Sequence, residues 1–169
     1  MRTIPVQELS YEKFRKYGDY IKMLDDDSYR TNAAPGRTNE FYPDQMQFFF
    51  NTDTPVSACV CCVSKEPELS KIAFAEFHGK TCEGVMPLDA DCVIFVAPAG
   101  RGLNPDQIEA FHVPKGTFVR LNVGVIHGRQ FTYNTDLVHV LVMLPQRTYA
   151  NDNTGIRIEE DDQVIVDIK

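Results

Sequence analysis

From residue 46 onward the chain consists of short apolar runs separated by turn residues, and this pattern constrains the fold more than any other feature. The runs cover residues 46–50, 56–63, 71–78, 92–97, 109–113, 117–122, 131–133, 136–144 and 163–168. Many of the gaps between them contain proline or glycine, which favour turns. Short strands at this spacing are typical of an antiparallel sandwich or barrel. The sequence therefore predicts an all-β fold.

A short helix is expected near the N-terminus. Ser10 can cap it, and the residues that follow at near-helical spacing are Tyr11, Phe14, Tyr17 and Ile21. Residues 31–47 are rich in Asn, Pro, Gly and Thr, which predicts a long surface loop that can act as a lid. In the last apolar run, at 163–168, apolar residues occupy alternate positions, which predicts an edge strand.

The length of the chain fits one domain, because 169 residues can bury one core and leave little room for a second. We expect a single domain over residues 1–169. Its parts are the N-terminal helix and lid-like loop at 10–47, the barrel at about 48–145, and a C-terminal extension at 146–169.

The charge of the chain argues against two classes of partner. With 24 acidic and 17 basic residues, the net charge is -7, and the sequence offers no basic stripe for nucleic acid and no polybasic membrane patch. The first residues lack the apolar core of a signal peptide, and no apolar run is long enough for a membrane-spanning helix. We expect a cytoplasmic protein.

The five cysteines are odd in number, and Cys59, Cys61 and Cys62 crowd one apolar run. This suits reduced, buried thiols better than a disulfide framework. The same cluster could instead bind a metal, but no second cysteine pair or spaced histidine pair accompanies it.

Polar side chains that can carry chemistry occur within the run at 71–78. In a strand, the period of two puts Ile72, Phe74, Glu76 and His78 on one face. A buried carboxylate must meet a cation, a metal or a proton donor, because burying it alone costs several kcal/mol. Glu83 begins the next strand, and a hairpin would bring it beside the first two polar groups.

A second motif lies 30 residues further on. Pro114-x-Gly116 predicts a tight turn, and Gly124 permits a bend that directs His127. Glu76-x-His78-x-x-x-x-Glu83 followed by these residues resembles the two-motif signature of the cupin superfamily, with Glu76 where most cupins have the first histidine.

The cupin resemblance implies a fold and a cofactor. The fold is a cupin-type double-stranded β-barrel (jelly roll) with a short N-terminal helix. The cofactor is one divalent metal ion, Zn, Mn, Fe or Ni, held by Glu76, His78, Glu83 and His127.

A closer resemblance covers most of the chain. The matching segments are Leu9–Phe14, Tyr17-Gly18-Asp19, Glu76-x-His78, Met86-Pro87-Leu88 with the strand at 93–96, and Gly124–His127. In order and spacing they resemble the ureidoglycolate lyase family. This implies a cytoplasmic homodimer that cleaves ureidoglycolate, a small carboxylate, to glyoxylate and urea in purine breakdown.

The chain departs from this family at several positions. Glu83 stands where glutamine is common, and Ile126-His127-Gly128 stands where the family has tryptophan and two histidines. Asn122 lies near the position of another histidine, and Asn39–Tyr42 replaces an Arg-Tyr-His-like stretch. The glutamate makes a four-ligand metal site more credible, whereas the other changes concern recognition of the substrate.

The expected catalytic residues are Glu76 and His127, with Glu76 either completing the metal shell or transferring a proton. The expected substrate-binding residues are Arg120, Asn122 and Tyr133, with Arg129 beside them in a secondary role. Arg120 would bind the substrate carboxylate if its face of the strand is interior and would be a surface charge if it is exterior.

His112 and His139 are interpreted as core or interface histidines outside the site. Besides the lyase, two other functions stay open. One is a cupin isomerase, epimerase or dioxygenase acting on a sugar or keto acid, and the other is a barrel that binds a small molecule without catalysis.

Overall fold

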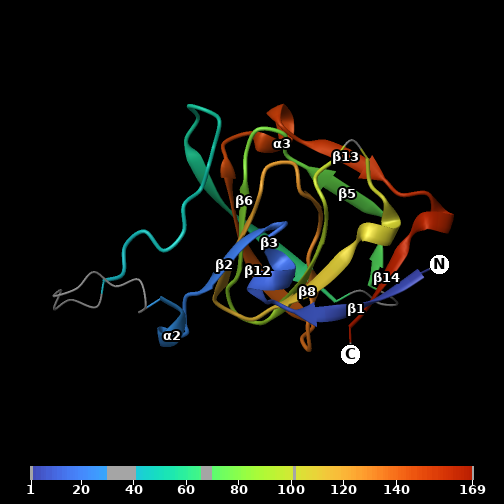
Figure 1. Ribbon diagram of the computed structural model, residues 1–169, viewed down its shortest axis with the longest axis horizontal. Coiled ribbons are helices and arrows are strands. Elements are labelled where there is room, and N and C mark those ends of the chain that lie inside the picture. Colours follow the sequence, from blue (N-terminus) through green and yellow to red (C-terminus); the bar gives the residue numbers. More distant parts are fainter. Residues whose placement is uncertain (1, 30–40, 66–69, 101, 169) are drawn as a thin grey trace.

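The computed structural model describes residues 2–29, 41–65, 70–100 and 102–168 (Figure 1). Its strands are β1 (Arg2–Glu8), β2 (Gly18–Lys22), β3 (Val56–Ser64), β4 (Lys71–Ile72), β5 (Phe74–Phe77), β6 (Glu83–Pro87), β7 (Cys92–Ala97), β8 (Glu109–Val113), β9 (Thr117–Leu121), β10 (Ile126–His127), β11 (Phe131–Thr132), β12 (Leu137–Pro145), β13 (Thr154–Arg157) and β14 (Val164–Asp167). Its helices are α1 (Tyr11–Phe14), α2 (Asp26–Tyr29), α3 (Thr148–Asn151), and the 3-10 turns η2 (Pro105–Gln107) and η3 (Glu160–Asp162). The predicted all-β fold is confirmed.

The strands form two sheets. One has the order β2-β9-β6-β12-β3, and the other has the order β13-β5-β10-β7-β8-β1-β14-β4, with β11 paired to β7. Val85 and Val119 of the first sheet pack in one buried cluster with Ile94 and Phe111 of the second. The sheets therefore enclose a common core, and the double-sheet barrel implied by the cupin resemblance is confirmed.

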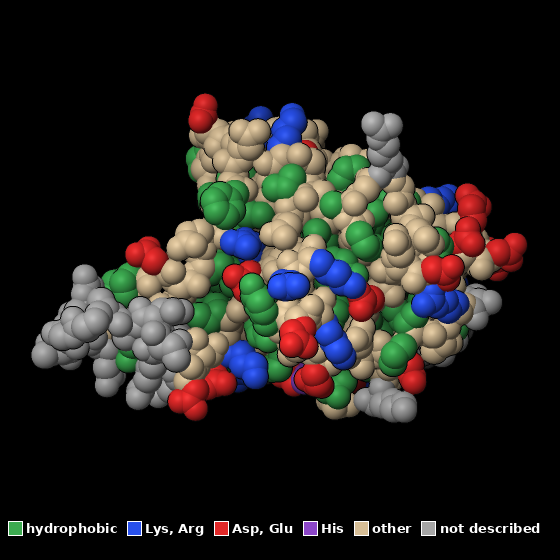
Figure 2. Space-filling model, viewed as in Figure 1, with side chains coloured by type: hydrophobic (Ala, Val, Ile, Leu, Met, Phe, Trp, Pro, Cys, Tyr) green, Lys and Arg blue, Asp and Glu red, His purple; other side chains and the backbone are tan. Residues whose placement is uncertain are grey.

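A second apolar cluster lies on the outer side of the larger sheet. Here Phe95 and Ala110 pack against Ile4 of β1 and Val164 of β14. No helix in the described ranges is long and apolar enough to cross a membrane. On the face shown in Figure 2, basic and acidic side chains are interspersed.

The N-terminal helix is shorter than predicted. Ser10 caps it as expected, accepting a hydrogen bond from the Lys13 amide at 3.4 Å, but α1 ends at Phe14. The prediction that the helix continues to Ile21 was wrong, because the chain turns into β2 and pairs with β9. At Gly18 a Cβ would lie 1.8 Å from the Arg120 carbonyl oxygen, so only glycine allows these two strands to approach.

The termini meet in the larger sheet. The strand β1, which the sequence analysis missed, runs parallel to both β8 and β14 (Figure 1). The prediction of β14 as an edge strand was therefore wrong, since β1 covers one side of it and β4 the other.

The predicted strand at 71–78 is interrupted at Ala73. Ile72 before the break and Ala75 after it both point to the outer core, whereas Phe74 is exposed. The expectation that Ile72 shares a face with Glu76 was wrong for this reason. The expected strand at 46–50 was also wrong, since it is reduced to a bridge between Phe50 and Thr81.

Two further predictions concern loops and thiols. The lid-like loop falls partly on residues 30–40, which lie outside the described residues. The five cysteines are free thiols as predicted, but Cys59 and Cys62 are exposed and Cys61 is half-buried. These three were wrongly expected to be buried, because β3 is the last strand of its sheet.

Candidate metal centre and its cavity

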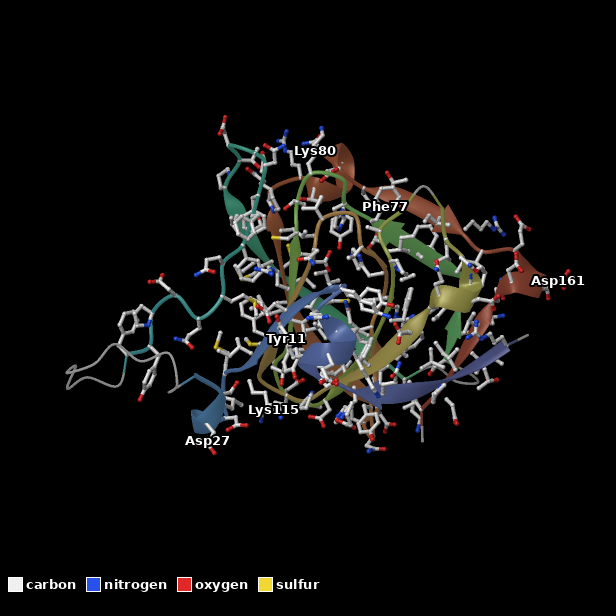
Figure 3. The ribbon with its side chains drawn as sticks, in the orientation of Figure 1. Tyr11, Asp27, Phe77, Lys80, Lys115 and Asp161 are labelled. Atoms are coloured by element: carbon white, nitrogen blue, oxygen red, sulfur yellow. The ribbon has the colours of Figure 1, made fainter. Side chains whose placement is uncertain are left out.

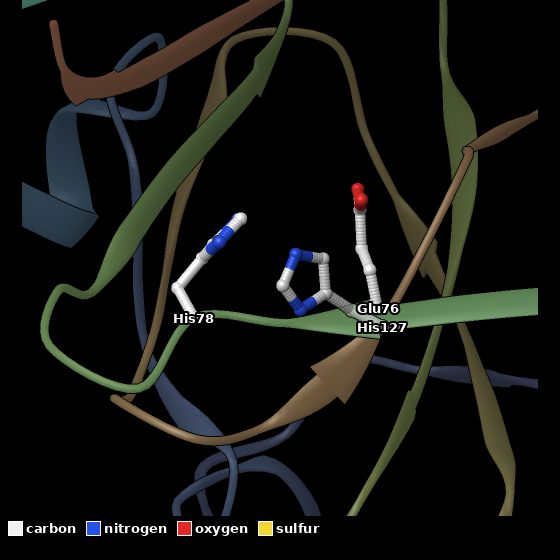
Figure 4. Close-up of side chains that lie close together, drawn as sticks. All are labelled: Glu76, His78 and His127. Carbon is white, nitrogen blue, oxygen red and sulfur yellow. The ribbon is translucent and has the colours of Figure 1, made fainter. Parts of the chain in front are cut away.

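Strand pairing brings the two sequence motifs together. In β5 and β10, Glu76 lies directly opposite His127. His78 follows β5 and Glu83 begins β6. The expected hairpin was wrong, because β5 and β6 belong to different sheets, but the connection between them still brings the carboxylate to the imidazole across the barrel. Figure 4 shows Glu76, His78 and His127 side by side, and their ligand atoms all lie within 4.8 Å of one another.

Glu83 joins the two histidines. Its Oε2 lies 2.9 Å from Nε2 of His78 and 3.0 Å from Nε2 of His127. All three side chains are buried. Because Glu83 and Val85 project from the same face of β6, the carboxylate faces the barrel interior, where Val85 joins the core.

Backbone carbonyls fix the orientation of both imidazoles. Nδ1 of His78 donates to the Asp152 carbonyl at 2.8 Å, and Nδ1 of His127 donates to the Val125 carbonyl at 2.9 Å. A carbonyl can only accept, so each Nδ1 carries the hydrogen and each Nε2 is directed at Glu83. Metal-binding histidines are held in the same way by a bond at the second nitrogen.

The electrostatics of the cluster favour charged groups. Burial would raise the pKa of Glu83, but the two histidines outweigh it and lower the pKa to about 2. Burial would lower the pKa of His127, but Glu83 outweighs it and raises the pKa to about 8. The carboxylate is therefore ionised at neutral pH and can accept a proton-bearing imidazole or a cation.

The donor set fits a divalent ion. The ligand atoms that converge are two imidazole nitrogens and a carboxylate oxygen of half-buried Glu76, while Glu83 bonds to both imidazoles, and such mixed N and O ligands suit Zn, Mn, Fe or Ni.

Residues of the C-terminal extension support this cluster. The Asp152 carboxylate accepts hydrogen bonds from the Gly79 and Lys80 amides at 2.9 and 2.8 Å, which fixes the turn after His78. Asn153 Nδ2 donates to Glu76 Oε2 at 2.8 Å. Neither residue was predicted from the sequence, because more than 70 positions separate each from its partners and no local pattern marks such contacts.

The cluster lies at one end of the barrel. Lys80, in the turn after β5, lies near the top of Figure 3, whereas Lys115, in the turn before β9, lies near the bottom. A cavity of about 220 Å³ adjoins the cluster; it is lined by Cys61, Phe74, Glu76, Glu83, Gly128, Arg129, Gln130, Val142 and Tyr149. The pKa of Tyr149 is raised by partial burial and by the charges of Glu83 and Glu76, so its phenol keeps its proton.

The three predicted substrate-binding residues lie outside the cavity beside the histidine–carboxylate cluster. Arg120 projects from the outer face of β9, where it donates to the Gln47 carbonyl at 2.8 Å, because Val119 and Leu121 occupy the interior face. Asn122 is exposed in the turn after β9. Tyr133 packs against His112 in a tilted arrangement, with ring centroids 4.2 Å apart. The structure brings none of the three into the cavity.

The two remaining histidines have their own partners. His112 lies between the carboxylates of Glu8, at 3.1 Å, and Asp91, at 2.9 Å. His139 contacts Asp89. Both lie outside the cluster, as the sequence analysis expected.

The structure explains one departure from the family pattern. At Gly128 a Cβ would lie 2.7 Å from the Phe95 ring and 3.3 Å from the Phe74 carbonyl oxygen. The second histidine of the pattern therefore cannot be accommodated here without displacing a buried aromatic ring.

The barrel and the histidine–carboxylate cluster within it define a cupin-type protein with a candidate metal centre. The chain belongs to the ureidoglycolate lyase family, whose model matches residues 1–165. No curated protein matches the chain.

Similar solved structures include a mutant of Bacillus subtilis oxalate decarboxylase, at 10% identity and a TM-score of 0.43, covering 62% of this chain and 24% of that chain. Another structure of that enzyme, from a study of its Mn(II) centres, matches at 9% identity and a TM-score of 0.43, covering 76% and 36%. RmlC from Streptococcus suis, in complex with dTDP-D-xylose, matches at 12% identity and a TM-score of 0.38, covering 54% and 44%. The chain thus spans about a quarter of the first decarboxylase chain.

Proposed function

We propose that this protein is a metal-dependent lyase that cleaves the C–N bond of ureidoglycolate, or of a closely related ureido acid, to release urea and glyoxylate. The observation that carries the proposal is the convergence of the two Nε2 atoms on Glu83, beside Glu76 and a cavity of small-molecule size. Family membership supports the same chemistry. We place this activity in purine breakdown in the cytoplasm.

The residues that would hold the ion are His78, Glu83 and His127, with Glu76 as a fourth ligand or as the proton-transfer group. A divalent ion supplies Lewis acidity toward the hydroxyl and carboxylate oxygens of such a substrate.

Glu76 is well placed for proton transfer. Asn153 holds its Oε2 at 2.8 Å, which fixes the carboxylate while it lines the cavity. In the proposed reaction Glu76 takes the proton of the substrate hydroxyl, the C=O bond forms, and the C–N electron pair leaves with the urea nitrogen. Glu76 then returns the proton to that nitrogen, so the reaction needs no further reactant.

Arg129 is the candidate for binding the substrate carboxylate, because it is the basic residue among those that line the cavity. Its guanidinium also donates to the Ser64 carbonyl at 3.1 Å, which holds it at the edge of β3. A guanidinium presents several donors in one plane and suits a carboxylate. In this role Arg129 replaces the earlier candidate, Arg120.

The test combines metal analysis with product detection. We expect the purified protein to bind about one divalent ion and to release glyoxylate and urea from ureidoglycolate. His78→Ala and His127→Ala should each lose metal and activity, whereas His139→Ala, a matched change outside the site, should keep both. Full metal retention in both site variants would refute the metal centre, and a metal-loaded wild type without products would refute the lyase.

Assays on the same purified protein distinguish the lyase from the other three candidate functions. Oxygen consumption during turnover would identify a dioxygenase, and conversion of a sugar or keto acid without urea would identify an isomerase or epimerase. A ligand that raises the melting temperature without turnover would identify a binding protein. Each of these results would replace the lyase proposal.

We also propose that two copies associate through β3. This strand of nine residues carries no charge, pairs with β12 on one side, and exposes Val56 and Val60. In a dimer with a two-fold axis, the same surface patch of each chain contacts its copy. Each chain has a net charge of -7, and an uncharged strand at the contact avoids repulsion between like charges. We expect a dimer in light scattering and dissociation by Val60→Lys but not by Val123→Lys. A wild-type monomer at micromolar concentration would refute it.

A further inference from the structure

One buried polar side chain of the cavity has no role in the chemistry above. Gln130, between β10 and β11, is only 5% exposed and lines the cavity next to Arg129. Within the described ranges no hydrogen bond reaches its side-chain amide. Neither amide atom of Gln130 is both sealed from solvent and without a partner, so the amide keeps some accessible surface, and Gln130 is a lining residue of the cavity. An amide that is open to a cavity can bond to a molecule held there, whereas most polar groups of nearly buried side chains already have a partner within the protein.

The other cavity residues do not supply that partner. Phe74 and Val142 are apolar, and the Glu83 oxygen that faces the histidines is already engaged. Arg129 has donors only, so it cannot accept from the N–H groups of Gln130. A molecule in the cavity is therefore the natural partner for an amide that offers both a donor and an acceptor.

The chemistry of the amide selects the kind of partner. A glutamine side chain offers an N–H donor and a C=O acceptor in one plane. A ureido group presents the complementary pair, a carbonyl oxygen and an N–H, also in one plane. A carboxylate or keto acid without the ureido group offers acceptors alone and would leave the Gln130 oxygen unpaired.

We infer that Gln130 binds the ureido group through two hydrogen bonds, donating to its carbonyl oxygen and accepting from its terminal nitrogen, and so selects ureido acids. The inference rests on the proposed function, because it assigns Gln130 to the urea that leaves and Arg129 to the carboxylate that becomes glyoxylate. It adds a specificity residue at a position outside the motifs of the sequence analysis.

The test uses two unreactive ligands that differ in one group. Hydantoate (N-carbamoylglycine) has the ureido group and the carboxylate but lacks the hydroxyl, so it cannot be cleaved. N-acetylglycine has the same shape with a methyl group in place of the terminal NH2. Calorimetry on the metal-loaded wild type should show hydantoate binding roughly tenfold more tightly, the effect expected for one buried hydrogen bond and one satisfied acceptor. In Gln130→Leu the two ligands should bind alike, with hydantoate weakened roughly tenfold or more.

The melting temperature of Gln130→Leu provides a second measurement. If Gln130 had only a structural role, this substitution would lower the melting temperature. Leucine fills a similar volume and removes an unpaired amide, so Gln130→Leu should melt at or above the wild-type temperature while losing selectivity. Gln107→Leu is the matched control, since Gln107 is exposed and lies outside the cavity; it should keep wild-type binding.

The outcomes separate this inference from the proposed function. Equal wild-type affinities for the two ligands, unchanged selectivity in Gln130→Leu, or a clearly lower melting temperature of that variant would overturn the role of Gln130. Release of glyoxylate by the wild type would still support the lyase in that case. Selective hydantoate binding without glyoxylate release would uphold Gln130 and refute the lyase.

Discussion

Replacing Glu83 by glutamine tests whether the carboxylate organises the centre. In the metal-free protein the change keeps the shape of the side chain and removes its charge from between two imidazoles, at 2.9 and 3.0 Å. The pKa of Glu83, lowered from 4.5 to about 2, corresponds to about 3 kcal/mol at about 1.4 kcal/mol per pKa unit. The pKa of His127, raised from 6.5 to about 8, corresponds to about 2 kcal/mol.

These two values describe one set of contacts and are not added. The Glu83 value is larger because that carboxylate also contacts His78. The stabilisation that follows from the lowered pKa of Glu83 is present above pH 4.5 and is lost as the pH falls through about 2. The contribution seen at His127 is fully present below pH 6.5 and is lost as the pH rises through about 8.

Metal-free wild type should therefore exceed Glu83→Gln by about 3 kcal/mol in free energy of unfolding at pH 6 and by about 1 kcal/mol at pH 9. Urea denaturation followed by circular dichroism measures both differences. Glu159→Gln, an exposed control, should change the free energy by about 0.5 kcal/mol or less. A difference that is the same at pH 6 and pH 9 would refute the charged contact.

Two further variants test the residues that position the site. Asp152→Ala removes the acceptor for two backbone amides in the turn after His78, so it should cost about 2–3 kcal/mol of unfolding free energy and weaken metal binding about tenfold, as denaturation and metal titration would show. Wild-type metal affinity in this variant would contradict the support role. Gly128→Ala places a Cβ 2.7 Å from the Phe95 ring and should cost about 1–3 kcal/mol, whereas at Gly102 a Cβ meets nothing within 4 Å. If Gly128→Ala and Gly102→Ala had equal melting temperatures, the crowding argument would fail.

Much of the candidate centre could be predicted from local spacing. His78 and Glu83 are five residues apart, at the connection between consecutive strands of different sheets, so their contact is a local one. His127 comes from a strand that follows a glycine bend, and only the resemblance linked it to the first motif. Arg120 shows the limit of such reasoning, because a period of two defines two faces without saying which one is interior.

The order of apolar runs and turns determined the all-β class and most strand positions, because each depends on neighbours within a few residues. Sheet order, the burial of β14, the placing of Asp152 and Asn153 against the histidines, and the isolation of Gln130 in the cavity were decided only in the tertiary structure. Those contacts join residues far apart in the chain. Their free energy depends on which surfaces pack together, which no local pattern encodes.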